Sequence, residues 1–364
     1  MYILFGIVGG FVALIAGGEL LVRGASNLAA AAKVSPLIIG LTVVAFGTSA
    51  PELAVSIQSC YEGKTDLAVG NAVGSNISNL LFILGVSAIA APLAVSLRLF
   101  RLDIPAMIVA ALMLLGFGWD GKLDRVEGAV CFLTLVCYFI FTVRQGRRES
   151  AIAAAESQIA VQEITYDPKK STAKDTILDV VKLLIGLALL VKGADWLVKA
   201  CVSLAQGFGV SELVIGLTVV AIGTSLPELV TSLMASLRGE RDLAVGNVVG
   251  SNILNILLVL GLSSVVAPDG INVDRQSLAF DIPVLIAMSV AAIPVFFSGM
   301  VISRIEGIAM LLYYLSYLGY LVRHASRPAG TVTPAMETVL FLAPLVPLVL
   351  TVIVVSRWKS KSTS

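Results

Sequence analysis

The chain has 364 residues, of which 57% are hydrophobic and 13% are charged, and its formal net charge is +1. A composition this apolar excludes an ordinary soluble domain, and the balanced charge offers no basic surface for nucleic acid. We therefore predict a membrane protein that has the lipid bilayer as its surroundings.

Eleven apolar stretches are each long enough to cross about 30 Å of hydrocarbon as a helix. In chain order they run from about 2–22, 37–60, 67–91, 104–119, 126–143, 177–198, 213–237, 243–267, 282–297, 305–322 and 339–355. A hydrophilic segment, 144–176, separates the first five from the next five. The predicted fold class is an all-α polytopic membrane protein.

The basic residues are distributed unevenly between the loops. With the N-terminus outside, the inner loops and the tail hold 16 Lys and Arg residues, whereas the outer loops hold 7. Because cytoplasmic loops are enriched in Lys and Arg, we predict a multi-pass protein of the cell membrane, either inner or plasma membrane. Its N-terminus would lie outside, and the 144–176 loop and the C-terminus would lie in the cytoplasm.

Two signature stretches repeat one sequence. Residues 36–86 match residues 212–262 at 31 of 51 positions without a gap, at an offset of 176. The first copy reads GTSAPE and then GNAVGSNISN, and the second reads GTSLPE and then GNVVGSNILN. Weaker matches extend the likeness along the chain, pairing Glu19 with Asp195 and Asp103 with Asp281. Each half is therefore one unit of five spans.

Because five is an odd number, the second unit enters the membrane from the opposite side. This predicts two inverted five-helix repeats, with ten core helices, a plan that many secondary transporters share. The predicted divisions are a first repeat at 1–143, a cytoplasmic loop at 144–176, a second repeat at 177–323, and an extra C-terminal transmembrane helix with its tail at 324–364.

Each signature places one carboxylate, Glu52 or Glu228, inside an apolar span with no basic residue within a helical turn. An unpaired charge at that depth costs roughly 2.5 to 3.5 kcal/mol even on the lenient insertion scale, so such residues are functional-site candidates. Two carboxylates at matched positions of inverted repeats suggest one site built from two halves. Glu19 and Asp195 instead have basic neighbours one turn away, which favours helix-end ion pairs.

A proline precedes each of these glutamates. Pro51 and Pro227 lack an N–H, so the carbonyls of Gly47 and Gly223 lose their helical partner, and we predict a helix break at each GTSxPE stretch. Freed carbonyls at membrane depth require protein, a polar cavity or a cation to satisfy them.

The second part of each signature supplies hydroxyl and amide groups. Ser75 and Asn79 lie four residues apart and share a helix face, and Ser251 and Asn255 repeat the arrangement. All candidate ligands are oxygen atoms, which select calcium, magnesium or sodium, and a flexible set of many ligands suits Ca²⁺. We predict no resident cofactor, because these ions would be transported substrates.

These paired motifs resemble the α-repeats of the calcium/cation antiporter superfamily, and most of all prokaryotic sodium/calcium exchangers. The resemblance covers about residues 1–323 and implies that Glu52 and Glu228 are the central Ca²⁺ ligands, in competition with Na⁺. By the same motif match, it implies further cation contacts from the following residues: Ala45, Thr48, Ser49, Ser75, Asn79, Ala221, Thr224, Ser225, Ser251 and Asn255.

One position departs from some members of that family, which carry aspartate where this chain has Asn255. With asparagine at both 79 and 255, the predicted site holds at most two negative charges. Two charges balance one Ca²⁺ but not three sodium ions.

The sequence thus predicts a secondary active transporter that exchanges Ca²⁺ for Na⁺ by alternating access. A proton/calcium or K⁺-dependent antiporter of the same fold is the alternative, and a cation channel is a more distant one. We predict a protein that is not an enzyme: the enzyme alternative, an intramembrane protease, is disfavoured because the chain has no GxGD motif, HExxH motif or Ser/His pair, and His324 is its only histidine.

Overall fold

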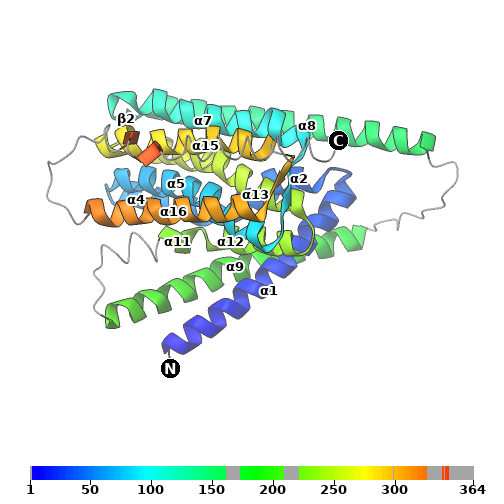
Figure 1. Cartoon of the computed structure of the whole chain (residues 1–364), viewed down its shortest axis with the longest axis horizontal. Coiled ribbons are helices and arrows are strands. Elements are labelled where there is room, and N and C mark those ends of the chain that lie inside the picture. Colours follow the sequence, from blue (N-terminus) through cyan, green and yellow to red (C-terminus); the bar gives the residue numbers. More distant parts are fainter. Residues whose placement is uncertain are drawn as a thin grey trace.

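A computed structural model of the chain describes residues 2–160, 173–208, 221–297, 299–325, 338–339 and 341–343. The longer helices are α1 (Tyr2–Ala32), α4 (Ala50–Tyr61), α5 (Thr65–Ser78), α7 (Ile104–Phe117), α8 (Arg125–Ala160), α9 (Ala173–Gly207), α12 (Leu226–Leu237), α13 (Arg241–Leu254), α15 (Ile282–Phe297) and α16 (Arg304–Ala325). Short helices and turns connect them: α2 (Pro36–Ile39), η1 (Gly40–Val44), α3 (Ala45–Thr48), η2 (Asn79–Ile83), α6 (Leu84–Ala90), η3 (Leu99–Asp103), η4 (Gly118–Asp120), α11 (Ala221–Thr224), η6 (Asn255–Leu260), α14 (Gly261–Val266) and η7 (Ser277–Asp281). Figure 1 shows most of the long helices running in roughly one direction, as in a membrane-spanning bundle.

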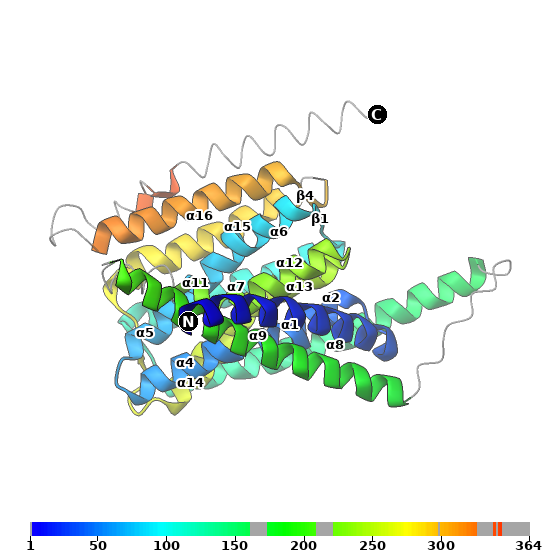
Figure 2. The ribbon, with the colours of Figure 1, turned by 90° about the horizontal axis from the view of Figure 1, so that it is seen from below.

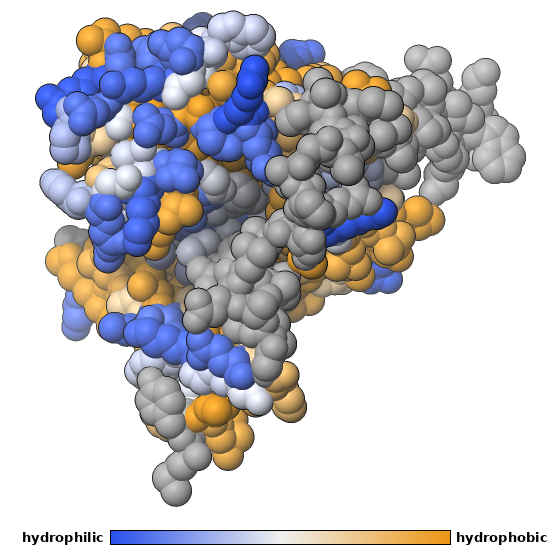
Figure 3. Space-filling model, turned by 90° about the vertical axis from the view of Figure 1, so that its left-hand side faces the viewer, coloured by the Kyte–Doolittle hydropathy of each residue, from blue (hydrophilic) through white to orange (hydrophobic). Residues whose placement is uncertain are grey.

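Seven helices in the described residues are long and apolar enough to cross a membrane, or eight if the pair bent by 42° at the first signature, Pro36–Thr48 with Ala50–Tyr61, counts as one span. The chain is therefore an all-helical multi-pass protein. The two spans that carry the GSN motifs are the most buried of them. Figure 3 looks onto one end of the bundle, where hydrophilic residues gather, while apolar residues lie along its sides.

This number is smaller than the eleven predicted spans, and the differences fall in three places. The predicted span 177–198 lies within α9, a continuous helix whose apolar stretch is interrupted by charged residues, among them Asp179, Lys182 and Lys192. Only Ala221–Leu237 of the predicted span 213–237 is described, and most of 339–355 lies outside the described residues. The predicted loop 144–176 is helical up to Ala160, as the end of α8, and again from Ala173.

Helices α1 and α9 pack against each other through glycines that bring their backbones into contact. A Cβ on Gly10 would lie 2.9 Å from the carbonyl oxygen of Gly193, and one on Gly17 would lie 2.8 Å from that of Gly186. As the residue number increases along α1, that of the contacting residue in α9 decreases, so the two helices are antiparallel (Figure 2). Gly10 and Gly17 correspond to Gly186 and Gly193 at the repeat offset, so equivalent positions exchange partners across the interface.

Two short antiparallel strand pairs join the two halves. Strand β1 (Leu93–Ala94) pairs with β4 (Val301–Ile302), and β2 (Lys122–Leu123) pairs with β3 (Ile271–Asn272). The β1 and β4 labels of Figure 2 and the β2 label of Figure 1 lie at opposite ends of the bundle. Each pair therefore combines a loop of the first half with a loop of the second half at the same end.

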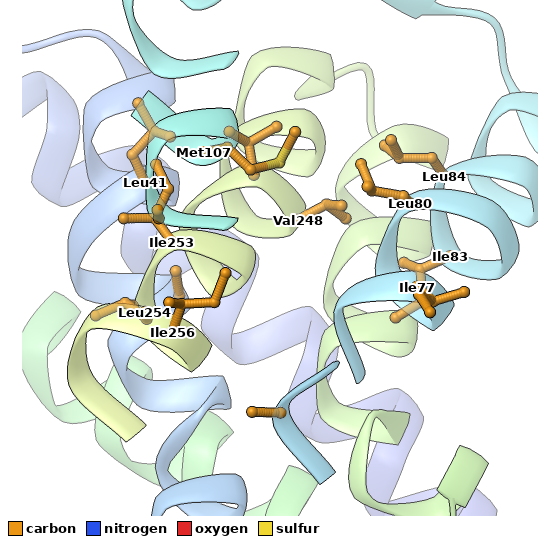
Figure 4. Close-up of a cluster of buried hydrophobic side chains, with 14 of the residues drawn as sticks. Leu41, Ile77, Leu80, Ile83, Leu84, Met107, Val248, Ile253, Leu254 and Ile256 are labelled. Atoms are coloured by element: carbon orange, nitrogen blue, oxygen red, sulfur yellow. The ribbon is translucent and has the colours of Figure 1, made fainter. Parts of the chain in front are cut away.

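The hydrophobic core surrounds α13, in which every residue from Leu243 to Leu254 is buried. Figure 4 shows side chains of α13, such as Val248 and Ile253, among those of the first half, including Leu41, Ile77 and Met107. The signature helices of the two halves therefore form one core. Because interiors are close-packed, this core fixes where the polar side chains of the signatures lie.

A buried carboxylate ties η3 to α8 in the first half, and an equivalent tie exists in the second half. The hydroxyl of Tyr138 donates to Oδ1 of Asp103 at 2.8 Å, and that of Tyr317 donates to Oδ1 of Asp281 at 3.1 Å. We expect Tyr138→Phe to lower the thermal unfolding midpoint of the detergent-solubilised protein, because a hydrogen bond to a charged group contributes about 1.5 to 3 kcal/mol. Tyr61→Phe is the control, since Tyr61 is 73% exposed. Equal midpoints for the two variants would contradict the role of this bond.

Candidate cation site

The signature helices are interrupted three residues before each of the two glutamates. Helix α3 ends at Thr48 and α4 begins at Ala50, and the intervening Ser49 has φ −81° and ψ 2°, which is not helical. Ser225 has φ −88° and ψ 8° at the equivalent break before α12. The breaks lie within the GTSxPE stretches, where each proline cannot donate a backbone hydrogen bond.

These breaks place both carboxylates in the first turn of a new helix, Glu52 in α4 and Glu228 in α12. The N-terminal end of a helix carries partial positive charge, which favours a carboxylate at that position. The relative exposure of Glu52 is 0% and that of Glu228 is 1%. Neither carboxylate forms an ion pair with a basic side chain among the ion pairs of the described residues.

The two spans that carry the second part of each signature, α5 with η2 and α13 with η6, contain π turns at equivalent places. The π turn η2 begins at Asn79 and η6 begins at Asn255, directly after α5 and α13. A third π turn, η1, precedes the first helix break. π turns within α-helices occur frequently at functional sites, because they change the hydrogen-bonding register and reorient nearby groups.

Contacts between the two halves bring the predicted site residues together. The Ser49 hydroxyl donates to Oε1 of Glu228 at 3.4 Å, and the hydroxyls of Thr48 and Ser251 lie 3.5 Å apart. The Ser225 hydroxyl lies 3.4 Å from that of Ser75. Each contact joins the GTSxPE stretch of one half to the signature of the other half, so the site spans the boundary between the halves.

Four of the predicted residues carry buried oxygen atoms without a hydrogen-bond partner among the described residues. These atoms are both carboxylate oxygens of Glu52, Oε2 of Glu228, Oδ1 of Asn79 and Oδ1 of Asn255. A buried acceptor without a partner is costly, so such groups usually mark a ligand-binding site or another functional role. Two carboxylates with neutral oxygens around them are a donor set for a hard cation.

The amide orientations of Asn79 and Asn255 are set by bonds across the boundary. Nδ2 of Asn79 donates to Oδ1 of Asn252 at 2.9 Å, and Nδ2 of Asn255 donates to Oδ1 of Asn76 at 3.0 Å. Each amide therefore uses its donor inside the protein and leaves its oxygen for another partner. An amide oxygen that faces the site attracts a cation, whereas an NH₂ group in the same place would attract an anion.

The remaining predicted residues occupy the same region with different partners. The carbonyl of Ala45 accepts bonds from the Ser49 amide at 2.9 Å and the Thr48 hydroxyl at 3.3 Å. Thr224 is partly buried at the end of α11. Of Ala221 only the backbone, at the start of α11, is described.

Four asparagines that the sequence prediction left out of the site donate to, or accept from, its residues by hydrogen bonds. Nδ2 of Asn71 donates to the carbonyl of Glu52 at 3.3 Å, and Nδ2 of Asn247 donates to the carbonyl of Glu228 at 3.4 Å. The other two, Asn76 and Asn252, hold the amides described above. A signal for them was present in the sequence, because all four recur in the GNxVGSN motif at the repeat offset.

Comparison with known proteins identifies the family. A family model described as sodium/calcium exchanger protein matches residues 2–144 and 178–323. The chain belongs to this family. The resemblance drawn from the signatures is thereby confirmed, and this family member is a transporter and not an enzyme.

Two relatives of this exchanger-family protein cover most of its length. The sodium/calcium exchanger MaX1 of Methanosarcina acetivorans is 32% identical over 335 residues, which covers 85% of this chain and 95% of MaX1. The inner membrane protein YrbG of Escherichia coli K12 is 36% identical over 283 residues, covering 77% of this chain and 84% of YrbG.

A solved structure of the sodium-calcium exchanger NCX_Mj, soaked with zero Na⁺ and Ca²⁺, superposes on this chain with a TM-score of 0.73 at 30% identity. The superposition covers 88% of this chain and 99% of NCX_Mj. The protein therefore has the NCX_Mj fold. Membership of this exchanger family implies Ca²⁺ and other cations as its substrates.

Proposed function

We propose that this protein exchanges Ca²⁺ for Na⁺ across the membrane, with Glu52 and Glu228 as the central ligands. The observation that supports this most directly is the set of five buried oxygen atoms on Glu52, Asn79, Glu228 and Asn255 that have no hydrogen-bond partner among the residues the structure describes. Two carboxylates match the charge of one Ca²⁺, and the amide oxygens of Asn79 and Asn255 extend the ligand set. Thr48, Ser49, Ser75, Ser225, Ser251 and, near the helix breaks, Thr224 and the carbonyls of Ala45 and Ala221 complete the proposed contacts.

Coupling follows from competition for one pair of carboxylates. When either Ca²⁺ or monovalent cations neutralise Glu52 and Glu228, the conformational change no longer has to carry buried negative charge through the membrane interior. An empty site retains that charge and resists the change. Alternating access with mutually exclusive occupancy therefore produces exchange rather than leak.

We further propose that the halves are inverted five-helix repeats that form ten core spans, with an eleventh span after them. Three observations support this: the antiparallel packing of α1 and α9, the pairing of β1 with β4, and the pairing of β2 with β3. β1 and β3 occupy corresponding places in the two repeats. If the repeats were parallel, these two strands would lie at the same end of the bundle. Instead β1, paired with β4, and β3, paired with β2, lie at opposite ends (Figures 1 and 2). The distribution of Lys and Arg supports an outside N-terminus and a cytoplasmic 144–176 segment in the cell membrane.

The coupling ion is assigned to Na⁺ on the similarity to MaX1 and NCX_Mj, whose names describe sodium/calcium exchange. The more distant relative ChaA of Bacillus subtilis, at 26% identity, is named a Ca²⁺/H⁺ antiporter, so protons are the competing candidate. A glutamate of the site could carry such a proton.

Measurement of ⁴⁵Ca²⁺ uptake into proteoliposomes under imposed Na⁺, K⁺ or H⁺ gradients tests the proposal. We expect an outward Na⁺ gradient to drive saturable uptake, and a pH gradient alone to drive none. Uptake driven by the pH gradient would establish the proton antiporter instead. Calcium flux that needs no opposing gradient would indicate a channel and overturn the exchange mechanism.

A further inference from the structure

We propose that Asn76 and Asn252 are positioning residues that present the amide oxygens of Asn255 and Asn79 to the transported cation. This inference rests on the proposed function, since it concerns how the same site keeps its cation selectivity. Asn76 and Asn252 occupy equivalent positions in the two halves, and both are fully buried.

The four asparagines form a reciprocal hydrogen-bonded group across the boundary between the halves. Nδ2 of Asn76 donates to the backbone carbonyl of Asn252 at 3.0 Å, and Nδ2 of Asn252 donates to the backbone carbonyl of Asn76 at 3.3 Å. Their Oδ1 atoms then accept from Asn255 and Asn79, at 3.0 and 2.9 Å. Each half thus orients a ligand of the other half.

The backbone carbonyls that anchor this group lie beside the π turns. Asn76 and Asn252 each stand three residues before a π turn, η2 or η6. The carbonyl of Asn76 also accepts the backbone N–H of Asn79, and a carbonyl oxygen has two lone pairs, so it can accept a side-chain donor as well. A backbone carbonyl can only accept, so it fixes which end of the Asn76 or Asn252 amide faces it.

The fixed orientation of the Asn252 amide also determines the orientation of the Asn79 amide, and Asn76 does the same for Asn255. Since Nδ2 of Asn252 points at a carbonyl, its Oδ1 is the atom presented to Asn79. A flipped Asn79 would set two oxygen acceptors against each other and turn its NH₂ group toward the site. The group therefore enforces the orientation in which Asn79 and Asn255 offer oxygen, the only one that attracts a cation.

Asn76 and Asn252 differ from ligands in one respect. In the described part of the chain, Oδ1 of Asn79 and Oδ1 of Asn255 have no partner, whereas the side-chain oxygen and nitrogen atoms of Asn76 and Asn252 all do. Their effect on a cation must therefore pass through Asn255 and Asn79.

A double-mutant cycle on the full-length protein in detergent tests this route. The readout is the Ca²⁺ concentration that gives half of the maximal thermal stabilisation, which reports binding by mass action. We expect Asn76→Ala and Asn255→Ala each to raise this concentration about ten- to hundredfold, the range for losing a hydrogen-bond-strength contact to a charged group. In the Asn255→Ala background, Asn76→Ala should add less than about twofold, because its only route is already absent.

The Asn79→Ala background is the matched comparison, and there Asn76→Ala should keep its full effect. Ser264→Ala is the control for a buried polar deletion, since Ser264 is fully buried and its hydroxyl donates to Gly261 in its own helix. If Asn76→Ala has the same effect in all backgrounds, it acts on stability in general and the proposal is overturned. If Asn76→Ala does not fold, Asn252→Ala in the Asn79→Ala background decides by the same criterion.

Failure of the proposed function gives a different result. If Ca²⁺ does not stabilise the wild-type protein but Na⁺ or another cation does, the assigned substrate is wrong, and the same cycle run with that cation still tests Asn76. If Ca²⁺ stabilises the wild type and the cycle is additive, only the positioning role is lost.

Discussion

Glu52→Gln and Glu228→Gln should each abolish calcium-driven exchange, with a loss of at least about a hundredfold in ⁴⁵Ca²⁺ uptake. Glutamine keeps the size of the side chain but removes one of the two negative charges that balance Ca²⁺. The divalent ion would then carry a net charge into a buried site, which costs several kcal/mol, and each 1.4 kcal/mol corresponds to tenfold in binding.

The same variants should not lower stability in cation-free buffer. The carboxylate oxygens of Glu52 have no hydrogen-bond partner in the described residues, so neutralising that group removes a desolvation cost. We expect an unchanged or higher thermal midpoint without cations and the loss of the increase that Ca²⁺ causes. Glu62→Gln is the control, because Glu62 pairs with Lys64 at the exposed end of α4. Wild-type flux in either site variant would exclude the replaced glutamate as a central ligand and overturn the two-glutamate site.

Gly250→Leu should also reduce exchange, for a steric reason. A Cβ at Gly250 would lie 2.7 Å from both Cα and the carbonyl oxygen of Leu41 and 2.8 Å from Cβ of Ala45. The clash is with backbone, so α13 and the η1–α3 segment must separate, which costs about 1 to 3 kcal/mol or more. Thr48 would then lose its contacts with Asn247 and Ser251. We expect at least a tenfold lower uptake and a lower thermal midpoint.

Gly116→Leu is the matched control, since Gly116 also lies within a helix, α7, and a Cβ there meets no described atom within 4 Å. Its flux and midpoint should stay close to wild type. If Gly250→Leu behaves like Gly116→Leu, the close approach of α13 to the first signature is not required for transport.

The duplication made much of the site predictable. Two glutamates at matched positions in apolar spans could be singled out without a structure, because a buried carboxylate is so costly that chance rarely preserves two. The prolines also predicted that the helices break in the GTSxPE stretches, although the actual interruption lies at Ser49 and Ser225.

Other features depend on how the halves pack, so the sequence could not show which groups they contact. Asn76 follows Ser75 directly and lies on a different helix face, and only the partner half shows what its amide contacts. The strands β1 to β4 have two residues each, too few for any alternation to be visible.

The strand pairs have a consequence for biosynthesis. Strand β1 emerges from the ribosome long before its partner β4, and β2 long before β3, so the first half leaves both strand edges unpaired until the second half has been inserted. Unpaired edges are sites of wrong association during folding. A fragment ending near residue 143 should therefore aggregate or be degraded when produced alone, and co-expression with the remaining fragment should rescue it. Each half therefore depends on the other to close both of its ends.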